Sequence, residues 1–125
     1  MKLLFATGNL NKAAEIQCVL PKEIEIITLK DIELKEDIPE TSDTIRGNAL
    51  QKVSYIKEHF NIDCFADDTG LEVLSLNGAP GVYSARYAGE KRNDQDNMDL
   101  VLEQLKTHTD RSARFKTVIA LELNG

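Results

Sequence analysis

Along the chain, short apolar runs typical of strands alternate with segments whose apolar residues recur at helical spacing. This pattern predicts that strands and helices alternate. Two short apolar runs, Lys2–Ala6 and Ile24–Leu29, predict two buried strands, and the second run is rich in β-branched residues. Between them, apolar residues recur at helical spacing over Asn11–Leu20, and Pro21 ends that helix. This alternation is typical of an α/β fold, and we expect a mixed central sheet flanked by helices.

The middle of the chain continues the alternation after an acidic loop over Lys30–Ser42. Apolar residues from Ile45 to Phe60 recur at helical spacing and predict a long helix. Two short strands are then expected at Cys64–Ala66 and Leu71–Leu76, because the polar turn formers of Asp67–Gly70 interrupt the apolar run.

The last third predicts one helix and one long strand. The helix begins near Asn93 or Asp94 and continues to Leu105. Apolar and polar residues alternate from Ala113 to Leu123, which predicts a half-buried strand. The chain stops shortly after this strand, where a hairpin partner is expected to follow. The pattern therefore predicts a chain that is truncated at its C-terminus.

Composition narrows the class of protein. The 125 residues suit a single domain over 1–125. No stretch is apolar enough to span a bilayer, and the first apolar run is too short for a signal peptide, so we expect a cytoplasmic protein with no membrane partner. Cys18 and Cys64 are far apart and lack metal-ligand spacing, which predicts two buried, reduced thiols. The net charge of -6 argues against nucleic acid as a partner but permits a small phosphorylated ligand.

The turn between the first strand and the first helix has the features of a phosphate site. A strand–turn–helix junction presents backbone N–H groups that favour an anion, and a lysine in the first helical turn adds positive charge. Spacing alone is equally compatible with a capped helix start and a solvated lysine. The six residues of this turn are Thr7, Gly8, Asn9, Leu10, Asn11 and Lys12.

Three acidic residues are candidates for metal chemistry. Asp67 and Asp68 are adjacent after an apolar run, where two carboxylates repel each other unless a cation or donor compensates them. One of them can ligate Mg²⁺ or polarise a water molecule, although an Asx-turn is the structural alternative. Glu40 is a second carboxylate that can complete a cation site with Asp68, or a solvated charge of the acidic loop.

Two further charged residues have supporting roles in this interpretation. Glu15 lies three residues after Lys12, so we expect an i,i+3 ion pair, with an approach to the metal as the alternative. Arg86 can hold a phosphate or pin a carboxylate, and structural pinning is favoured.

Taken together, these segments resemble the inosine triphosphatase family, also called XTP/dITP diphosphatases. The order and spacing of five pieces across nearly the whole chain carry the resemblance: Thr7-Gly8-Asn9 with Lys12 and Glu15, Glu40-Thr41 with Asn48-Ala49, Ala66–Leu71, Gly78–Tyr87 and Ala113–Phe115.

The resemblance implies a two-lobed mixed sheet flanked by helices and a Mg²⁺-dependent homodimer. Such an enzyme hydrolyses ITP, dITP or XTP to a monophosphate and pyrophosphate. The Thr7–Lys12 turn would hold the triphosphate, Asp68 would be general base and metal ligand, and Glu40 the second metal carboxylate. Thr69 would touch the nucleotide, and Asp67 would support the site.

The family's base-recognition segments, Phe-Gly-Tyr-Asp, a later lysine and Ser-His-Arg, are absent from this chain. Two other interpretations therefore stay open. One is a Maf-like nucleotide pyrophosphatase, against which the Gly78–Tyr87 segment argues. The other is a non-catalytic nucleotide-binding remnant.

Overall fold

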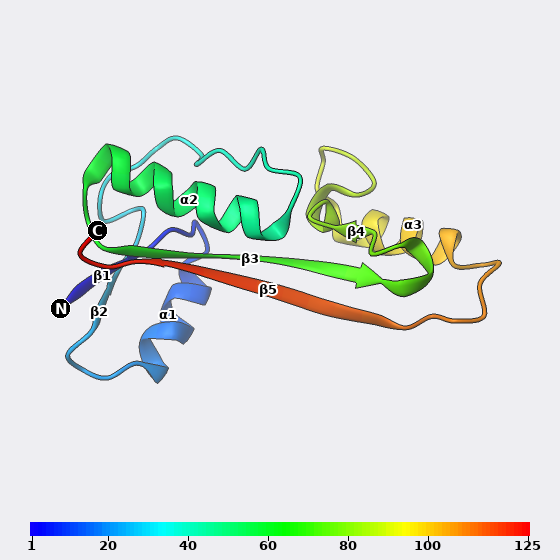
Figure 1. Ribbon diagram of the computed structural model, residues 1–125, viewed down its shortest axis with the longest axis horizontal. Helices are drawn as coiled ribbons and strands as arrows, with labels where there is room; N and C mark the ends of the chain where they lie inside the picture. Colours follow the sequence, from blue (N-terminus) through cyan, green and yellow to red (C-terminus); the bar gives the residue numbers. More distant parts are fainter. The chain divides into compact units, whose positions relative to one another are not determined.

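The computed structural model describes all residues from Met1 to Gly125 and divides them into two compact units. The first unit comprises Met1–Ser42, Arg46–Asp68 and Ile119–Gly125, and the second comprises Asp43–Ile45 and Thr69–Val118. Five strands form one mixed sheet, in the order β2-β1-β3-β4, with β5 also paired to β3 (Figure 1). The α/β fold with a mixed sheet and flanking helices, predicted from the alternating pattern, is confirmed.

The first unit is built on parallel strands. Strand β1 (Lys2–Phe5) pairs in parallel with both β2 (Glu25–Ile27) and the beginning of β3 (Cys64–Val73). Helices α1 (Leu10–Val19) and α2 (Ile45–Phe60) lie on opposite sides of these strands (Figure 1). Both helices fall where helical spacing predicted them.

The core of the first unit lies between its strands and helices. Leu4 and Phe5 of β1, Ile56 of α2 and Cys64 of β3 are at most 1% exposed, and the Phe5 ring stacks on Phe65 with centroids 4.4 Å apart. Burial raises the pKa of the Cys64 thiol to about 11. Cys18 is exposed, so the prediction of two buried thiols is wrong for this residue, which lies on the outer face of α1.

The second unit has shorter elements. After β3 come two 3₁₀ turns, η1 (Leu74–Leu76) and η2 (Ser84–Arg86), with the two-residue strand β4 (Pro80–Gly81) between them. Helix α3 (Asp94–Gln104) follows, and β5 (Ala113–Glu122) returns along β3. Val73, Val101 and Leu105 form the core of this unit, with three partly buried residues packed against it, Leu71, Leu76 and Tyr87.

Two predicted strand boundaries are wrong. Asp67–Gly70 does not interrupt the strand, because β3 continues from Cys64 to Val73, and Leu74–Leu76 forms a 3₁₀ turn rather than strand. Pairing with β5 keeps β3 extended through its polar residues. Local turn propensity is overridden by cross-strand hydrogen bonding here.

The long strand predicted at the C-terminal end exists, but it is much less buried than its pattern indicates. Phe115, Ile119 and Leu121 are exposed by 77%, 68% and 56%, and the one buried residue of β5 is Ala120, from the alternate row. No other segment of the chain packs over the larger apolar residues, so alternation correctly predicted the strand and wrongly predicted its burial.

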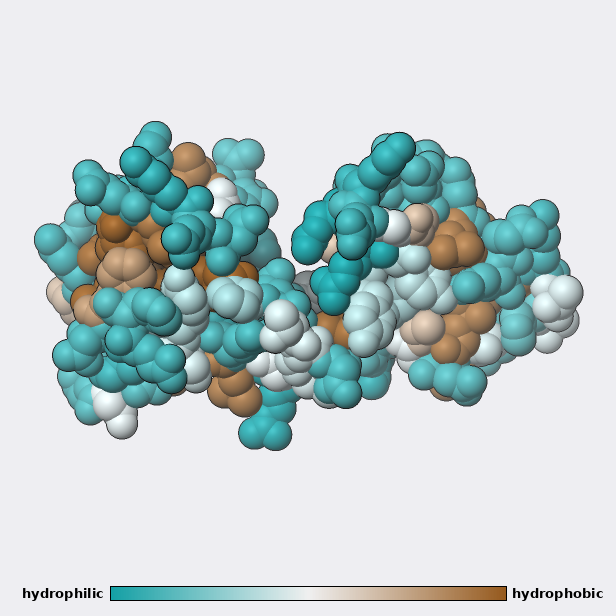
Figure 2. All heavy atoms as spheres, turned by 90° about the horizontal axis from the view of Figure 1, so that it is seen from above, coloured by the Kyte–Doolittle hydropathy of each residue, from teal (hydrophilic) through white to brown (hydrophobic).

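The face of the molecule that Figure 2 shows is mostly hydrophilic, with scattered hydrophobic patches. None of the helices has the length and apolar character needed to cross a membrane.

Gly70 of β3 lies tightly against the backbone of β4, which gives a test of the second unit. A Cβ at this position would collide with the Gly81 carbonyl group and would lie 2.7 Å from Ile45 Cδ1. We predict that Gly70→Ala lowers the free energy of unfolding by about 2 kcal/mol or more, measured by urea denaturation, because the backbone of β4 must shift. Gly8→Ala is the matched control, since a Cβ there meets nothing within 4 Å. Equal stability of the two variants would contradict the close approach.

Candidate active site

The turn after β1 is organised by two side chains that accept backbone hydrogen bonds. Thr7 Oγ1 accepts from the Asn9 amide at 3.1 Å, and Asn9 Oδ1 accepts from the Lys12 amide at 3.1 Å. Asn9 is therefore the N-cap of α1. The oxygen atoms of these two side chains therefore shape the turn.

The same turn leaves its outer surface open to a ligand. The first amides of an α-helix have no partner within the helix, and at α1 these include the amides of Leu10 and Asn11. Both residues are exposed, as is Gly8, and no atom crowds the space beside Gly8. The positive end of the helix dipole adds to this amide cluster, so the corner is suited to an anion.

Lys12 connects this corner to strand β3. Its Nζ donates to Asp67 Oδ2 at 3.0 Å, and its side chain stays 41% exposed. The expected ion pair with Glu15 is wrong, because the lysine crosses to β3 instead of pairing along the helix, and Glu15 is exposed on α1. A partly buried carboxylate on the sheet is a better partner than a solvated one on the same helix.

A second polar cluster lies between α2 and β3. Lys52 Nζ is 2.8 Å from Glu40 Oε1 and 3.9 Å from Asp68 Oδ1, and it donates to the Asp67 carbonyl oxygen at 2.6 Å. Asn48, one helical turn before Lys52, accepts from the Ser42 amide at 2.8 Å, and it also acts to lower the pKa of the Asp68 carboxyl group. The structure thus brings Glu40 and Asp68 to one ammonium group, although they are far apart in sequence.

Asp67 and Asp68 point to opposite faces of the sheet. Successive side chains of a strand alternate between faces, and here Asp67 meets α1 whereas Asp68 meets α2. The adjacent carboxylates are therefore kept apart by the strand itself, and each has a lysine of a different helix. The Asx-turn alternative is wrong, because both residues lie within a continuous strand.

The surroundings of Asp68 favour its protonated form. Burial raises the pKa of Asp68 above its ordinary value of 3.8, and the charges of Glu40 and Asp67 act in the same direction. The Lys52 ammonium and the hydrogen bond from Asn48 oppose this rise without cancelling it. Asp68 is thus a stronger proton acceptor than an exposed aspartate.

The donor set is compatible with Mg²⁺. Glu40 and Asp68 supply two carboxylates, and the chain has no group of three or more acidic, histidine or cysteine side chains placed to hold a metal. Mg²⁺ is commonly bound through one or two carboxylates together with substrate phosphates and water, rather than by a complete protein cage. Glu40 and Asp68, both within ion-pair distance of one ammonium group, can supply the protein's share of such a ligand set.

Sequence reasoning missed Lys52 and gave Asn48 no role. Both lie on one face of α2, four residues apart, beside the buried row that contains Ala49 and Val53. A usable signal was present, since two polar residues at i,i+4 spacing next to an apolar row predict a polar contact at the edge of a helix's buried face.

Two other candidate residues lie in the second unit. Thr69 is exposed on β3, and its hydroxyl is 2.8 Å from the Thr117 hydroxyl of β5. The Arg86 guanidinium lies over the Tyr83 ring, 5.2 Å from its centroid. Arg86 therefore packs within the Gly78–Tyr87 segment, and no carboxylate partner is found for the pinning that was expected.

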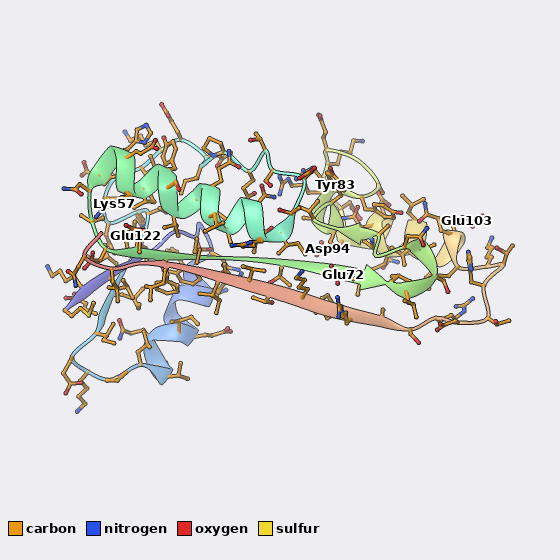
Figure 3. The ribbon with its side chains drawn as sticks, viewed as in Figure 1. Lys57, Glu72, Tyr83, Asp94, Glu103 and Glu122 are labelled. Carbon is orange, nitrogen blue, oxygen red and sulfur yellow. The ribbon has the colours of Figure 1, made fainter.

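A hollow of about 360 Å³ lies elsewhere in the second unit, beside Glu72, Leu74 and Arg114. Arg114 Nε donates to Glu72 Oε1 at 2.8 Å on this surface, and Figure 3 labels Glu72 on β3. The ion pair satisfies both charges, and the candidate residues of the first unit do not line the hollow.

The raised pKa of Asp68 predicts how an amide at this position affects stability. Folding disfavours the ionised form, so ionised Asp68 destabilises the protein at neutral pH and does not do so below its unfolded pKa of 3.8. In buffer without divalent cations, Asp68→Asn should raise the free energy of unfolding at pH 7, and the gain should shrink as the pH falls towards 4.

Urea denaturation across this pH range makes the measurement, with Asp110→Asn as the contrasting variant. Hydrogen bonds from the Ser112 hydroxyl and amide lower the pKa of Asp110, so its amide variant should not be stabilised at pH 7. A loss of stability in Asp68→Asn at pH 7 that persists unchanged at low pH would contradict the electrostatic account.

Comparison with known proteins places this chain in a family. The model of the Ham1 family matches residues 3–125. A dITP/XTP pyrophosphatase of Christiangramia forsetii is 62% identical over the whole chain, which spans 66% of that protein. One of Porphyromonas gingivalis is 52% identical over 122 residues, and there the chain spans 62% of the relative.

Solved structures agree with the sequence relatives. The Ham1 protein of Staphylococcus aureus superposes with a TM-score of 0.90 at 36% identity, over 98% of this chain and 63% of its own. A dITP/XTP pyrophosphatase of Mycobacterium abscessus gives a TM-score of 0.84 at 40% identity, over 97% of this chain and 65% of its own. The resemblance read from five sequence segments is thereby confirmed, and the chain belongs to the Ham1 family.

Proposed function

We propose that the protein to which this chain belongs hydrolyses non-standard purine nucleoside triphosphates, such as dITP, XTP and ITP, to a monophosphate and pyrophosphate in a Mg²⁺-dependent reaction. The relatives named dITP/XTP pyrophosphatase support the substrate class. The observation that carries the proposal is that Glu40 and Asp68 share one ammonium group, while the neighbouring Asp67 holds Lys12 of the anion-binding turn.

The turn and Lys12 bind the phosphates in this proposal. The amides at the start of α1 favour an anion, and the exposed part of the Lys12 side chain adds a cation on the same side. Asp67 holds Lys12 towards β3, which limits the conformations that the lysine explores before the ligand arrives.

Glu40 and Asp68 are the residues that would hold Mg²⁺. When bound, the ion offsets phosphate charge and makes the bond to the leaving pyrophosphate easier to break. Asn48 favours the ionised form of Asp68, which is the form that ligates a metal ion.

Asp68 also orients the attacking water and accepts its proton. The water oxygen forms a bond to the α-phosphorus, the bond between that phosphorus and the α–β bridging oxygen breaks, and pyrophosphate leaves with the bonding electron pair. A raised pKa makes Asp68 a better acceptor for the proton than an ordinary aspartate. Lys12 and the helix amides stabilise the charge that develops on the phosphates.

Other parts of the proposal come from the sequence and the family resemblance. The contact of Thr69 with the nucleotide and assembly as a homodimer come from the resemblance, whereas the supporting roles of Glu15 and Arg86, a cytoplasmic location and a single domain over residues 1–125 come from the sequence.

Pyrophosphate release from dITP, XTP and ATP with Mg²⁺ tests the proposal. The assay uses the 125-residue chain and, in parallel, the same chain joined to the last third of the Christiangramia forsetii relative. We predict release from dITP and XTP with little from ATP, and Asp68→Asn should lower turnover roughly 10²-fold or more with little change in nucleotide affinity. Asp110→Asn makes the same chemical change on an exposed loop and should retain full turnover.

Three outcomes would contradict parts of the proposal. Equal release from ATP and dITP would contradict the substrate class. Nucleotide binding without release in both proteins would favour a binding module. Full turnover in Asp68→Asn would remove Asp68 from the mechanism.

A further inference from the structure

Lys52 lies among oxygen atoms of the kind that a divalent metal ion uses as ligands. Its Nζ lies within 2.8 Å of Glu40 Oε1 and 2.6 Å of the Asp67 carbonyl oxygen, with Asp68 Oδ1 at 3.9 Å. Carboxylate and backbone carbonyl oxygens are ligands of hard divalent cations. The Lys52 side chain is 12% exposed, so the ammonium group is largely removed from water and depends on these oxygens for compensation.

We propose that Lys52 is a resident cation, which keeps Glu40 and Asp68 together while no metal is bound and leaves both carboxylates when a divalent ion binds. The inference rests on the proposed function, in which these two residues hold Mg²⁺. The inference adds that the Lys52 ammonium group competes with a divalent ion for Glu40 and Asp68. The ion therefore binds weakly until Lys52 is displaced.

The physical reason is the balance of charge at the cluster. Glu40 and Asp68 repel each other when no cation lies between them, and the cost is large because both are partly buried. An ammonium group within ion-pair distance of both carboxylates offsets that repulsion. A divalent ion offers twice the charge to the same oxygens, but it must first overcome the ammonium group that is already there.

Lys12 provides a comparison within the same unit. It contacts one carboxylate, that of Asp67, and its side chain is 41% exposed. Lys12 therefore does not lie between the two proposed metal ligands. Of the two lysines, Lys52 alone contacts both Glu40 and Asp68, which gives it a role that a simple ion pair does not have.

Mn²⁺ binding to the 125-residue chain without nucleotide tests the proposal, with free Mn²⁺ measured by electron paramagnetic resonance. Lys52→Met removes the competing charge and should tighten Mn²⁺ binding by roughly fivefold or more. Lys57→Met is the matched control, because it removes the same charge from the last turn of α2, where Figure 3 labels Lys57. Lys57 makes no ion pair with Glu40 or Asp68, so its replacement should change affinity by less than about twofold. Unchanged or weaker Mn²⁺ binding in Lys52→Met would overturn the proposal.

A measurement on the unmodified chain covers the case in which Lys52→Met does not fold. Acetic anhydride labels exposed lysine side chains, and mass spectrometry gives the labelling of Lys52 relative to Lys57. Saturating Mg²⁺ should increase this ratio severalfold, because displacement exposes the Lys52 amine. An unchanged ratio at saturating Mg²⁺ would also overturn the proposal.

The two proposals fail in different ways. If pyrophosphate is released but Lys52→Met does not bind Mn²⁺ more tightly, the enzymatic proposal stands and the proposed role of Lys52 is overturned. Competition at Lys52 without pyrophosphate release in either protein supports the role of Lys52 and overturns the enzymatic proposal.

Discussion

The compensation of charge along β3 is the constraint on which the candidate site depends. Asp67 and Asp68 are adjacent in sequence, but strand alternation sends them to opposite faces, where each meets a lysine from a different helix. Lys12 fixes the start of α1 to the strand, and Lys52 fixes α2 and the Glu40 loop to it. One short strand segment thus positions an anion-binding turn on one side and a pair of carboxylates on the other.

Features of the fold that depend on residues close together in sequence could be predicted, whereas those that depend on distant segments could not. The strand–turn–helix at Thr7–Lys12 and the helix Ile45–Phe60 follow from spacing within a few residues, and the sequence predicted both. The continuity of β3 through Asp67–Gly70 was not predictable in this way. It requires β5, about 50 positions further along the chain, whose pairing overrides local turn propensity. The exposure of Phe115 was missed because alternation predicts which residues share a face and does not show what covers that face.

The candidate residues divide in the same way. Glu40 and Asp68 were chosen for their chemistry and their match to a family, and the structure brings them to a common partner. That partner, Lys52, was missed because a lysine on an amphipathic helix normally lies in solvent. Only the fold shows that this side chain is largely buried between carboxylates. Family membership supports the substrate class. The arrangement of Glu40, Asp68 and Lys52 supports the proposal that these two carboxylates form a cation site.

The central claim is that Glu40 and Asp68 form a divalent cation site on the side of β3 that faces α2. The most direct measurement is a crystal structure of the chain grown with Mn²⁺, with the ion located by its anomalous scattering. The account predicts one peak within coordination distance, about 2.1 Å, of a carboxylate oxygen of each residue, with Lys52 moved away from both. A peak bound elsewhere, with Lys52 still between Glu40 and Asp68, would contradict it.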